Sequence, residues 1–235
     1  MSFSMAENVE RIREKMARAA QAAGRDPSEI LLCAACKTRT VETVRESAKL
    51  PIDLFGENHV QELVEKTDAG AYLGKPGHFI GHLQTNKIKK VLGRAALIQS
   101  VDSEHLLLAL EAAAAKADIQ QDILLEVNIG DEASKSGITA EGLGPLLEKA
   151  AEQPHLHVKG LMAIPPVNDN DTENRRHLAA MRALFDKAAD LHDDRITMQI
   201  LSMGMSDDFE NAILEGSTLV RIGTAIYGPR DYSKK

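Results

Sequence analysis

Residues 30–39 read ILLCAACKTR, and this stretch decides between the two folds that the rest of the chain allows. Its apolar first part predicts a buried strand, and polar residues begin only at Lys37. An open doubly wound sheet usually carries a glycine-rich phosphate loop directly after its first strand. Neither that loop nor a Walker A sequence follows residue 36. The stretch therefore favours a closed barrel.

Further apolar runs follow, separated by amphipathic stretches of helical length, of which 103–117, 143–151 and 173–191 are examples. Ser4 and Glu7 have capping-box spacing and predict an additional N-terminal helix. Strands that alternate with helices imply right-handed β-α-β units. Eight such units in 235 residues close most economically into one (β/α)8 TIM barrel, an α/β fold of a single domain over 1–235. The strand candidates are 30–36, 52–55, 78–80, 96–101, 123–128, 158–164, 198–201 and 218–222.

The charge balance argues against a nucleic-acid partner. The chain carries 35 acidic and 28 basic residues, a net charge of −7, whereas binding to phosphate backbones relies on Lys and Arg. The short cluster Lys87, Lys89 and Lys90 is expected to be a solvated helix face. No apolar run is long enough to span a bilayer, and the first residues lack the apolar core of a secretory signal. We therefore expect a cytoplasmic protein without a membrane partner.

Two patterns could indicate a metal or redox site, and neither is favoured. Cys33 and Cys36 are the only cysteines, and residues three apart in a strand point to opposite faces. They are expected to be two buried side chains rather than a disulfide or half of a zinc site. His78 and His82 flank a strand-like segment with Gly81 between them, which argues against a helical metal pair. We expect no metal.

Lys37 is the first candidate for chemistry. In α/β barrels reactive groups gather at the carboxyl ends of the strands, and Lys37 stands where the first strand ends. Alternation puts it on the same face as Cys33 and Ala35, so it would enter the barrel mouth if these small side chains point inward. A lysine amine that loses its proton in such surroundings can attack an aldehyde. From position alone, a lysine that ends a strand in solvent is the simpler interpretation.

Other strand ends also carry polar groups. Residues 57–59 (Glu57, Asn58 and His59) follow the second strand and offer polar groups at the rim. Barrels often hold phosphate between the loops after strands seven and eight. There the hydroxyls of Ser202 and Thr224, with backbone N–H groups near Gly204 and Gly223, supply donors for an anion. Turn geometry explains the same residues equally well.

Six further motifs stand in order along the chain: CKT, FGENHVQE, HFIGHLQTNK, LEVNIGDEASKSG, GLMAIPP and LSMGMSDDFENAILEGSTLVRIGTAIYG. Together they resemble the family of pyridoxal phosphate homeostasis proteins. The resemblance extends from residue 32 to residue 227 and implies a fold-type III barrel for pyridoxal 5′-phosphate (PLP), similar to the N-terminal domain of alanine racemase.

The resemblance also implies roles for individual residues. PLP would form a Schiff base with Lys37, and Arg221 would lie near the pyridine nitrogen. The phosphate would be bound by Ser202, Gly223 and Thr224 with Met203 beside them, and the pocket would be lined by Asn58 and His82. The family pattern usually has a serine before the lysine and a tryptophan before HFIG. This chain has Cys36 and Gly77 there and no tryptophan. Cys36 is expected to face away from the ring, and Gly77 to leave the mouth more open.

An arginine at the pyridine nitrogen would be compatible with a carrier or with racemase-like chemistry, but not with most other PLP reactions. It disfavours protonation of the ring, which weakens the electron sink that those enzymes use. A racemase also needs a second base, which alanine racemase takes from the C-terminal region of its partner subunit, and we expect no such domain after residue 227. We therefore expect a monomeric PLP-binding protein without catalytic residues. It would act in intracellular PLP homeostasis by buffering the cofactor or delivering it to apo PLP-dependent enzymes. A single-domain amino-acid racemase and a ligand-free structural barrel are the alternatives.

Overall fold

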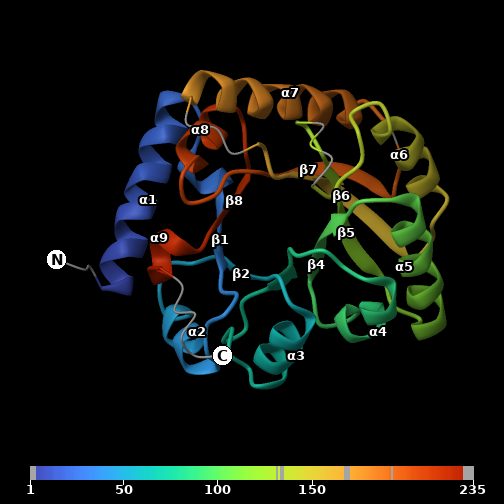
Figure 1. The fold of residues 1–235 in the computed structure, drawn as a ribbon, viewed down its shortest axis with the longest axis horizontal. Helices are drawn as coiled ribbons and strands as arrows, with labels where there is room; N and C mark the ends of the chain where they lie inside the picture. Colours follow the sequence, from blue (N-terminus) through green and yellow to red (C-terminus); the bar gives the residue numbers. More distant parts are fainter. Residues whose placement is uncertain (1–3, 131, 133–134, 167–169, 192, 230–235) are drawn as a thin grey trace.

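Eight parallel strands close into a barrel in the order of the sequence, with β1 paired to both β2 and β8 (Figure 1). The computed structural model describes residues 4–130, 132, 135–166, 170–191 and 193–229. This architecture confirms the predicted α/β barrel. The strands are β1 (Leu31–Ala35), β2 (Leu54–Glu57), β3 (Gly77–Phe79), β4 (Leu97–Val101), β5 (Gln121–Val127), β6 (Leu156–Ala163), β7 (Ile196–Ser202) and β8 (Leu219–Ile222).

Helices surround the barrel and cover its outer surface (Figure 1). The described helices are α1 (Met5–Ala22), α2 (Val41–Ser47), α3 (Val60–Asp68), α4 (Ile88–Val91), α5 (Glu104–Ala117), α6 (Leu143–Ala151), α7 (Asp171–Ala189), α8 (Phe209–Leu214) and α9 (Thr224–Tyr227), with short 3-10 helices η1 (Pro27–Glu29) and η2 (Thr85–Lys87). The additional helix α1 contacts α8 and α9. Within the described part of the chain, no helix combines the length and apolarity that a membrane crossing requires.

Local sequence signals set the helix boundaries. Ser4 caps α1 as predicted: its hydroxyl accepts from the Glu7 amide at 3.3 Å, and its own amide donates to the Glu7 carboxylate at 2.6 Å. This reciprocal pair satisfies two amides that a helix start leaves without partners. Ser103 caps α5 with a single bond, in which its hydroxyl accepts from the Leu106 amide. The predicted helix at 103–117 therefore begins at its cap.

One face of β1 points into the barrel interior, and the other packs against the surrounding helices. Cys33 packs inside with Leu54 of β2 and Leu219 of β8. Cys36 belongs to the outer cluster that β1 shares with α1. Both cysteines are buried and free, as the spacing predicted. Lys37 is four residues after Cys33 and therefore lies on the same side of the strand, which directs its side chain toward the barrel mouth.

Candidate functional site

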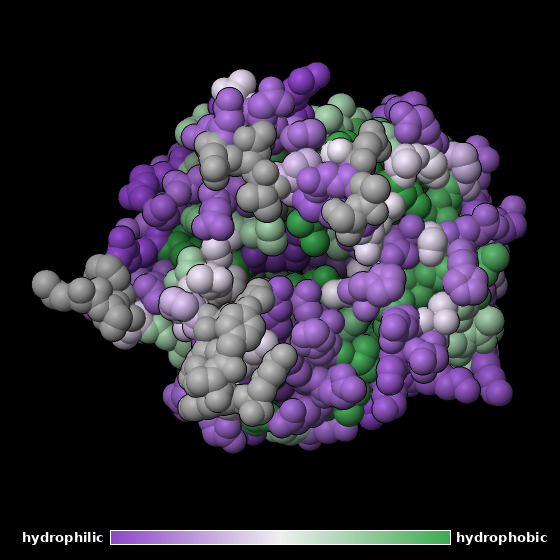
Figure 2. All heavy atoms as spheres, viewed as in Figure 1, coloured by the Kyte–Doolittle hydropathy of each residue, from purple (hydrophilic) through white to green (hydrophobic). Residues whose placement is uncertain are grey.

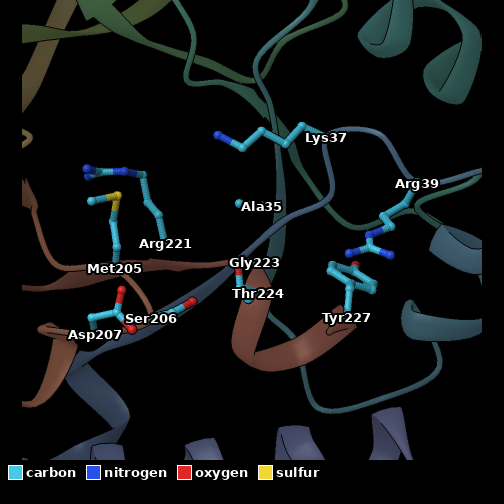
Figure 3. Close-up of a pocket in the computed structure, with 10 residues that line it drawn as sticks. All are labelled: Ala35, Lys37, Arg39, Met205, Ser206, Asp207, Arg221, Gly223, Thr224 and Tyr227. Carbon is cyan, nitrogen blue, oxygen red and sulfur yellow. The ribbon is translucent and has the colours of Figure 1, made fainter. Parts of the chain in front are cut away.

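A cavity of about 150 Å³ lies at the carboxyl ends of β1, β7 and β8 (Figure 3). It brings together four of the predicted site residues, Lys37, Arg221, Gly223 and Thr224. Figure 3 shows the Lys37 side chain extending past Ala35 toward the side of the cavity where Arg221 lies. The full lining is Ala35, Lys37, Arg39, Met205, Ser206, Asp207, Arg221, Gly223, Thr224 and Tyr227.

The lining is suited to an anion. Among its described residues, Lys37, Arg39 and Arg221 are cationic and Asp207 alone is acidic. Positive charge concentrated in a hollow attracts anionic ligands. Figure 2 shows that the face seen down the barrel is hollowed near its centre. The cavity therefore favours a small molecule that carries negative charge.

Arg221 is held inside the barrel by a chain of hydrogen bonds. Its side chain is buried, and it donates to Ser202 Oγ at 2.6 Å and to the carbonyl of Ala163 at 3.0 Å. Ser202 Oγ in turn donates to Gln99 Oε1 at 2.6 Å, and Gln99 Nε2 donates to His78 Nδ1 at 2.9 Å. Burial lowers the pKa of His78 to about 4, so this imidazole is neutral and accepts. This series of hydrogen bonds fixes the orientation of the Arg221 guanidinium group.

The ends of β7 and β8 form the opposite wall of the cavity. A Cβ atom at Gly223 would lie 3.0 Å from the Ala35 carbonyl oxygen, a tight contact that favours glycine at this position. Thr224 starts the short helix α9, and Ser206 Oγ accepts from the Ala225 amide at 3.3 Å. Hydroxyls and glycine backbone at the ends of these two strands are typical of phosphate sites in barrels.

Two predicted phosphate residues lie elsewhere. Ser202 and Met203 are fully buried and do not line the cavity. Met203 packs in the main hydrophobic core, and the Ser202 hydroxyl is engaged with Arg221 and Gln99. Their roles beside a phosphate stay predictions. The loop that follows them, with Met205 and Ser206, lines the cavity instead. Ser206, the second serine of the LSMGMS motif, is the residue from which the sequence could have indicated this part of the lining.

Asn58 and His82 line a second cavity, of about 180 Å³. Asn58 Oδ1 is buried and has no hydrogen-bond partner among the described residues. His82 is exposed, with Nδ1 at 3.2 Å from the Asp102 carboxylate. The two cavities are neighbours: Arg221 lines the first, and its guanidinium donates to the carbonyl of Ala163, the residue before Ile164 in the lining of the second. The predicted site residues are therefore divided between neighbouring cavities rather than gathered in one.

Glu126 of β5 lines the second cavity and was not singled out from the sequence. Burial and the nearby Asp102 raise its pKa from about 4.5 to about 7, although Arg221 and His82 act in the opposite direction. Isolated carboxylates in strands give no sequence signal, because burial depends on the neighbouring strands. The carboxyl group is thus poised to gain or lose a proton near neutrality.

The raised pKa of Glu126 predicts that stability depends on pH. Its contribution is complete below pH 4.5, where both states are protonated, and it is lost as pH rises toward 7. Glu126→Gln should therefore become progressively more stable than the wild type across that interval. Each tenfold difference between the acid dissociation constants of the folded and unfolded states contributes about 1.4 kcal/mol. Urea unfolding from pH 4 to pH 8 measures the effect, with Glu65→Gln on the exposed face of α3 as the control. Parallel curves for wild type and Glu126→Gln would contradict the assignment.

Known proteins match this chain over nearly its whole length. The family model of the alanine racemase N-terminal domain matches residues 4–231. A protein of Aquifex aeolicus is 41% identical over 226 residues, which cover 96% of this chain and 98% of the relative. A protein of Escherichia coli K12 is 40% identical over 234 residues, which cover 98% and 99%. Both relatives are named pyridoxal phosphate homeostasis protein.

Solved structures share the barrel. An unknown protein from Bifidobacterium adolescentis superposes with a TM-score of 0.88 at 34% identity, over 95% of this chain and 94% of that chain. PipY of Synechococcus elongatus, solved with PLP bound, gives a TM-score of 0.78 at 27% identity, over 91% and 100%. Alanine racemase from Corynebacterium glutamicum gives 0.72 at 18% identity, over 96% of this chain and 63% of that chain, which shows a common fold.

Proposed function

The chain belongs to the family of pyridoxal phosphate homeostasis proteins, and from this membership we propose that it binds PLP covalently through Lys37. It would keep the cofactor in reserve for intracellular use or deliver it to apo PLP-dependent enzymes. The observation that supports the proposal is one cavity that contains a lysine amine together with the hydroxyl and glycine residues at the ends of β7 and β8. We also propose that the protein is a cytoplasmic monomer.

The donor set fits the cofactor. Lys37 enters the cavity from β1, and Thr224 approaches it from the other side (Figure 3). PLP carries its aldehyde and its phosphate-bearing arm on adjacent carbons of one ring, so a lysine and a group of phosphate donors in the same small cavity suit it. When bound, PLP supplies that aldehyde and an electron-withdrawing ring. Lys37 Nζ would form a carbon–nitrogen double bond with the aldehyde carbon, and the aldehyde oxygen would leave as water. Water or a competing amine reverses the step.

The residues around the cavity favour storage over catalysis. We propose that Arg221 faces the ring nitrogen and keeps it unprotonated, because two adjacent cations repel each other. Tyr227 also lines the cavity, but its hydroxyl hydrogen-bonds Ser47 at 2.9 Å. Burial raises the pKa of Tyr227 far above neutrality, so it is poorly suited to act as a base. The arginine argues against most PLP-dependent reactions but is compatible with a racemase, so the engaged hydroxyl of Tyr227 is the feature that favours a carrier over a racemase.

A paired assay separates the two functions. The PLP-loaded protein is incubated with L-alanine, and D-alanine is measured. In parallel it is mixed with an apo PLP-dependent enzyme whose recovered activity reports transfer. We expect transfer faster than spontaneous release of PLP and no D-alanine above the protein-free control. Sustained formation of D-alanine would establish the racemase instead. Transfer no faster than spontaneous release would contradict delivery.

A further inference from the structure

A buried ion network lies directly behind the strand end that carries Lys37. Lys66 of α3 is only 1% exposed, and its Nζ lies 2.7 Å from Glu57 Oε1 and 3.2 Å from Glu62 Oε2. Glu57, which the sequence placed at the rim, is completely buried at the end of β2. One cation and two carboxylates are thus gathered next to the end of β1, and none of the three lines the cavity.

This network contacts the backbone on both sides of Lys37. Lys66 Nζ donates to the carbonyl oxygen of Cys36 at 2.8 Å. The amide of Thr38 donates to Glu62 Oε2 at 2.7 Å. The residues before and after Lys37 are therefore held by two side chains that also contact each other.

The side chain of Cys36 adds a further link. Its Sγ donates to Glu57 Oε1 at 2.8 Å, and burial raises the pKa of the thiol well above its usual value. The thiol therefore stays protonated and acts as a donor. It faces away from Lys37, as the alternation of β1 requires.

The contact at Thr38 holds an unfavourable backbone conformation. Thr38 has a φ of +65°, a region that β-branched residues avoid because of clashes with their own backbone. Such conformations persist only where surrounding contacts enforce them, and they concentrate at functional sites. The Glu62 bond to the Thr38 amide is a contact of this kind. The Glu62 bond holds the sharp turn that follows β1, and this turn sets the direction in which the Lys37 side chain projects.

We propose that Lys66, Glu57 and Glu62 are positioning residues that orient Lys37 Nζ for attack on the aldehyde of PLP. The inference rests on the proposed function and adds to it the device that aims the amine. A buried ion pair is weak evidence for stability, because apolar side chains of the same volume often serve as well. Orientation explains why charged groups stand here, since small misplacements of a reacting group slow a reaction strongly.

Glu62 offers the cleanest test, because its side chain is 23% exposed, whereas those of Lys66 and Glu57 are 1% and 0% exposed. Glu62→Ala removes the acceptor for the Thr38 amide, and Glu62→Gln keeps an acceptor oxygen. Glu65→Ala, on the exposed face of the same helix, is the matched control. Three quantities are measured for each protein: the rate of adduct formation with PLP by visible absorbance, the affinity for pyridoxine 5′-phosphate, and the thermal unfolding midpoint. Pyridoxine 5′-phosphate has an alcohol in place of the aldehyde and cannot react.

We expect Glu62→Ala to form the adduct at least about tenfold more slowly than the wild type. Its affinity for pyridoxine 5′-phosphate should stay within about twofold of the wild type, as for a substitution away from the ligand. Glu62→Gln should recover most of the rate, and Glu65→Ala should match the wild type in all three measurements. The inference is overturned if Glu62→Ala reacts at the wild-type rate, or if it loses affinity for the alcohol by the same factor. A Glu62→Gln protein as slow as Glu62→Ala also overturns it. Failure of the proposed function gives a different result, since the wild-type protein would then form no adduct at all.

Discussion

Lys37→Ala protein is expected to form no borohydride-stable adduct with PLP. Lys37 is the lysine that lines the cavity at the end of β1, and an adduct requires an amine within bonding distance of the aldehyde. The remaining wall, with Gly223 and Thr224, is untouched by the substitution. Weak, reversible binding of the phosphate should therefore persist. Visible absorbance and mass measurement after reduction report the covalent and non-covalent forms separately.

Lys135→Ala is the matched control for this experiment. Lys135 lines the neighbouring cavity, and its Nζ donates to the carbonyl of Pro165 at 2.9 Å. It is thus a lysine at the same end of the barrel but outside the cavity of Lys37. The control should retain the adduct at wild-type occupancy. A Lys37→Ala protein with undiminished occupancy would show that another amine reacts.

The second large effect concerns stability. Lys66→Met should lower the free energy of unfolding by about 3–5 kcal/mol, the usual cost of removing one partner of a buried pair. Glu57 would keep its buried carboxylate, and the carbonyl of Cys36 would lose its donor. Burial already raises the pKa of Glu57 in the presence of Lys66. Loss of the cation removes the group that opposes this shift, so the carboxyl is expected to take up a proton.

Denaturant unfolding of the protein without PLP measures this effect. Lys49→Met is the control, because Lys49 pairs with Glu46 on the surface, where both side chains are more than half exposed. It should change stability little. A second substitution, Glu57→Leu in the Lys66→Met background, should recover part of the loss by removing the unpaired carboxyl group. A Lys66→Met protein as stable as the wild type would mean that the pair contributes nothing in the folded state.

The barrel could be predicted because apolar runs and caps are local signals. All eight strands lie within a few residues of their predicted places, and the alternation of β1 correctly separated Cys33 from Cys36. The side that Lys37 faces follows from the same alternation. The expectation of a phosphate site at β7 and β8 rested on a general property of barrels together with the hydroxyl and glycine residues at these strand ends.

The sequence could not predict how deeply the polar residues at the strand ends are buried, or which side chains they contact. The seventh strand was expected to end at residue 201 but includes Ser202, which places that hydroxyl inside the barrel beside Arg221. The second strand similarly extends to Glu57 and buries it. Whether a polar residue at a strand end faces solvent or another side chain depends on strand register. The pairing of Glu57 with Lys66, nine residues later, has no local signature.

The most direct test of the central claim is to load the wild-type protein with PLP, reduce it with borohydride and map the modified peptide by mass spectrometry. The account predicts a coloured protein whose colour is lost on reduction and a stable mass increase on the peptide that contains Lys37. A preparation that stays colourless at saturating PLP, or a modification confined to other lysines, would contradict it.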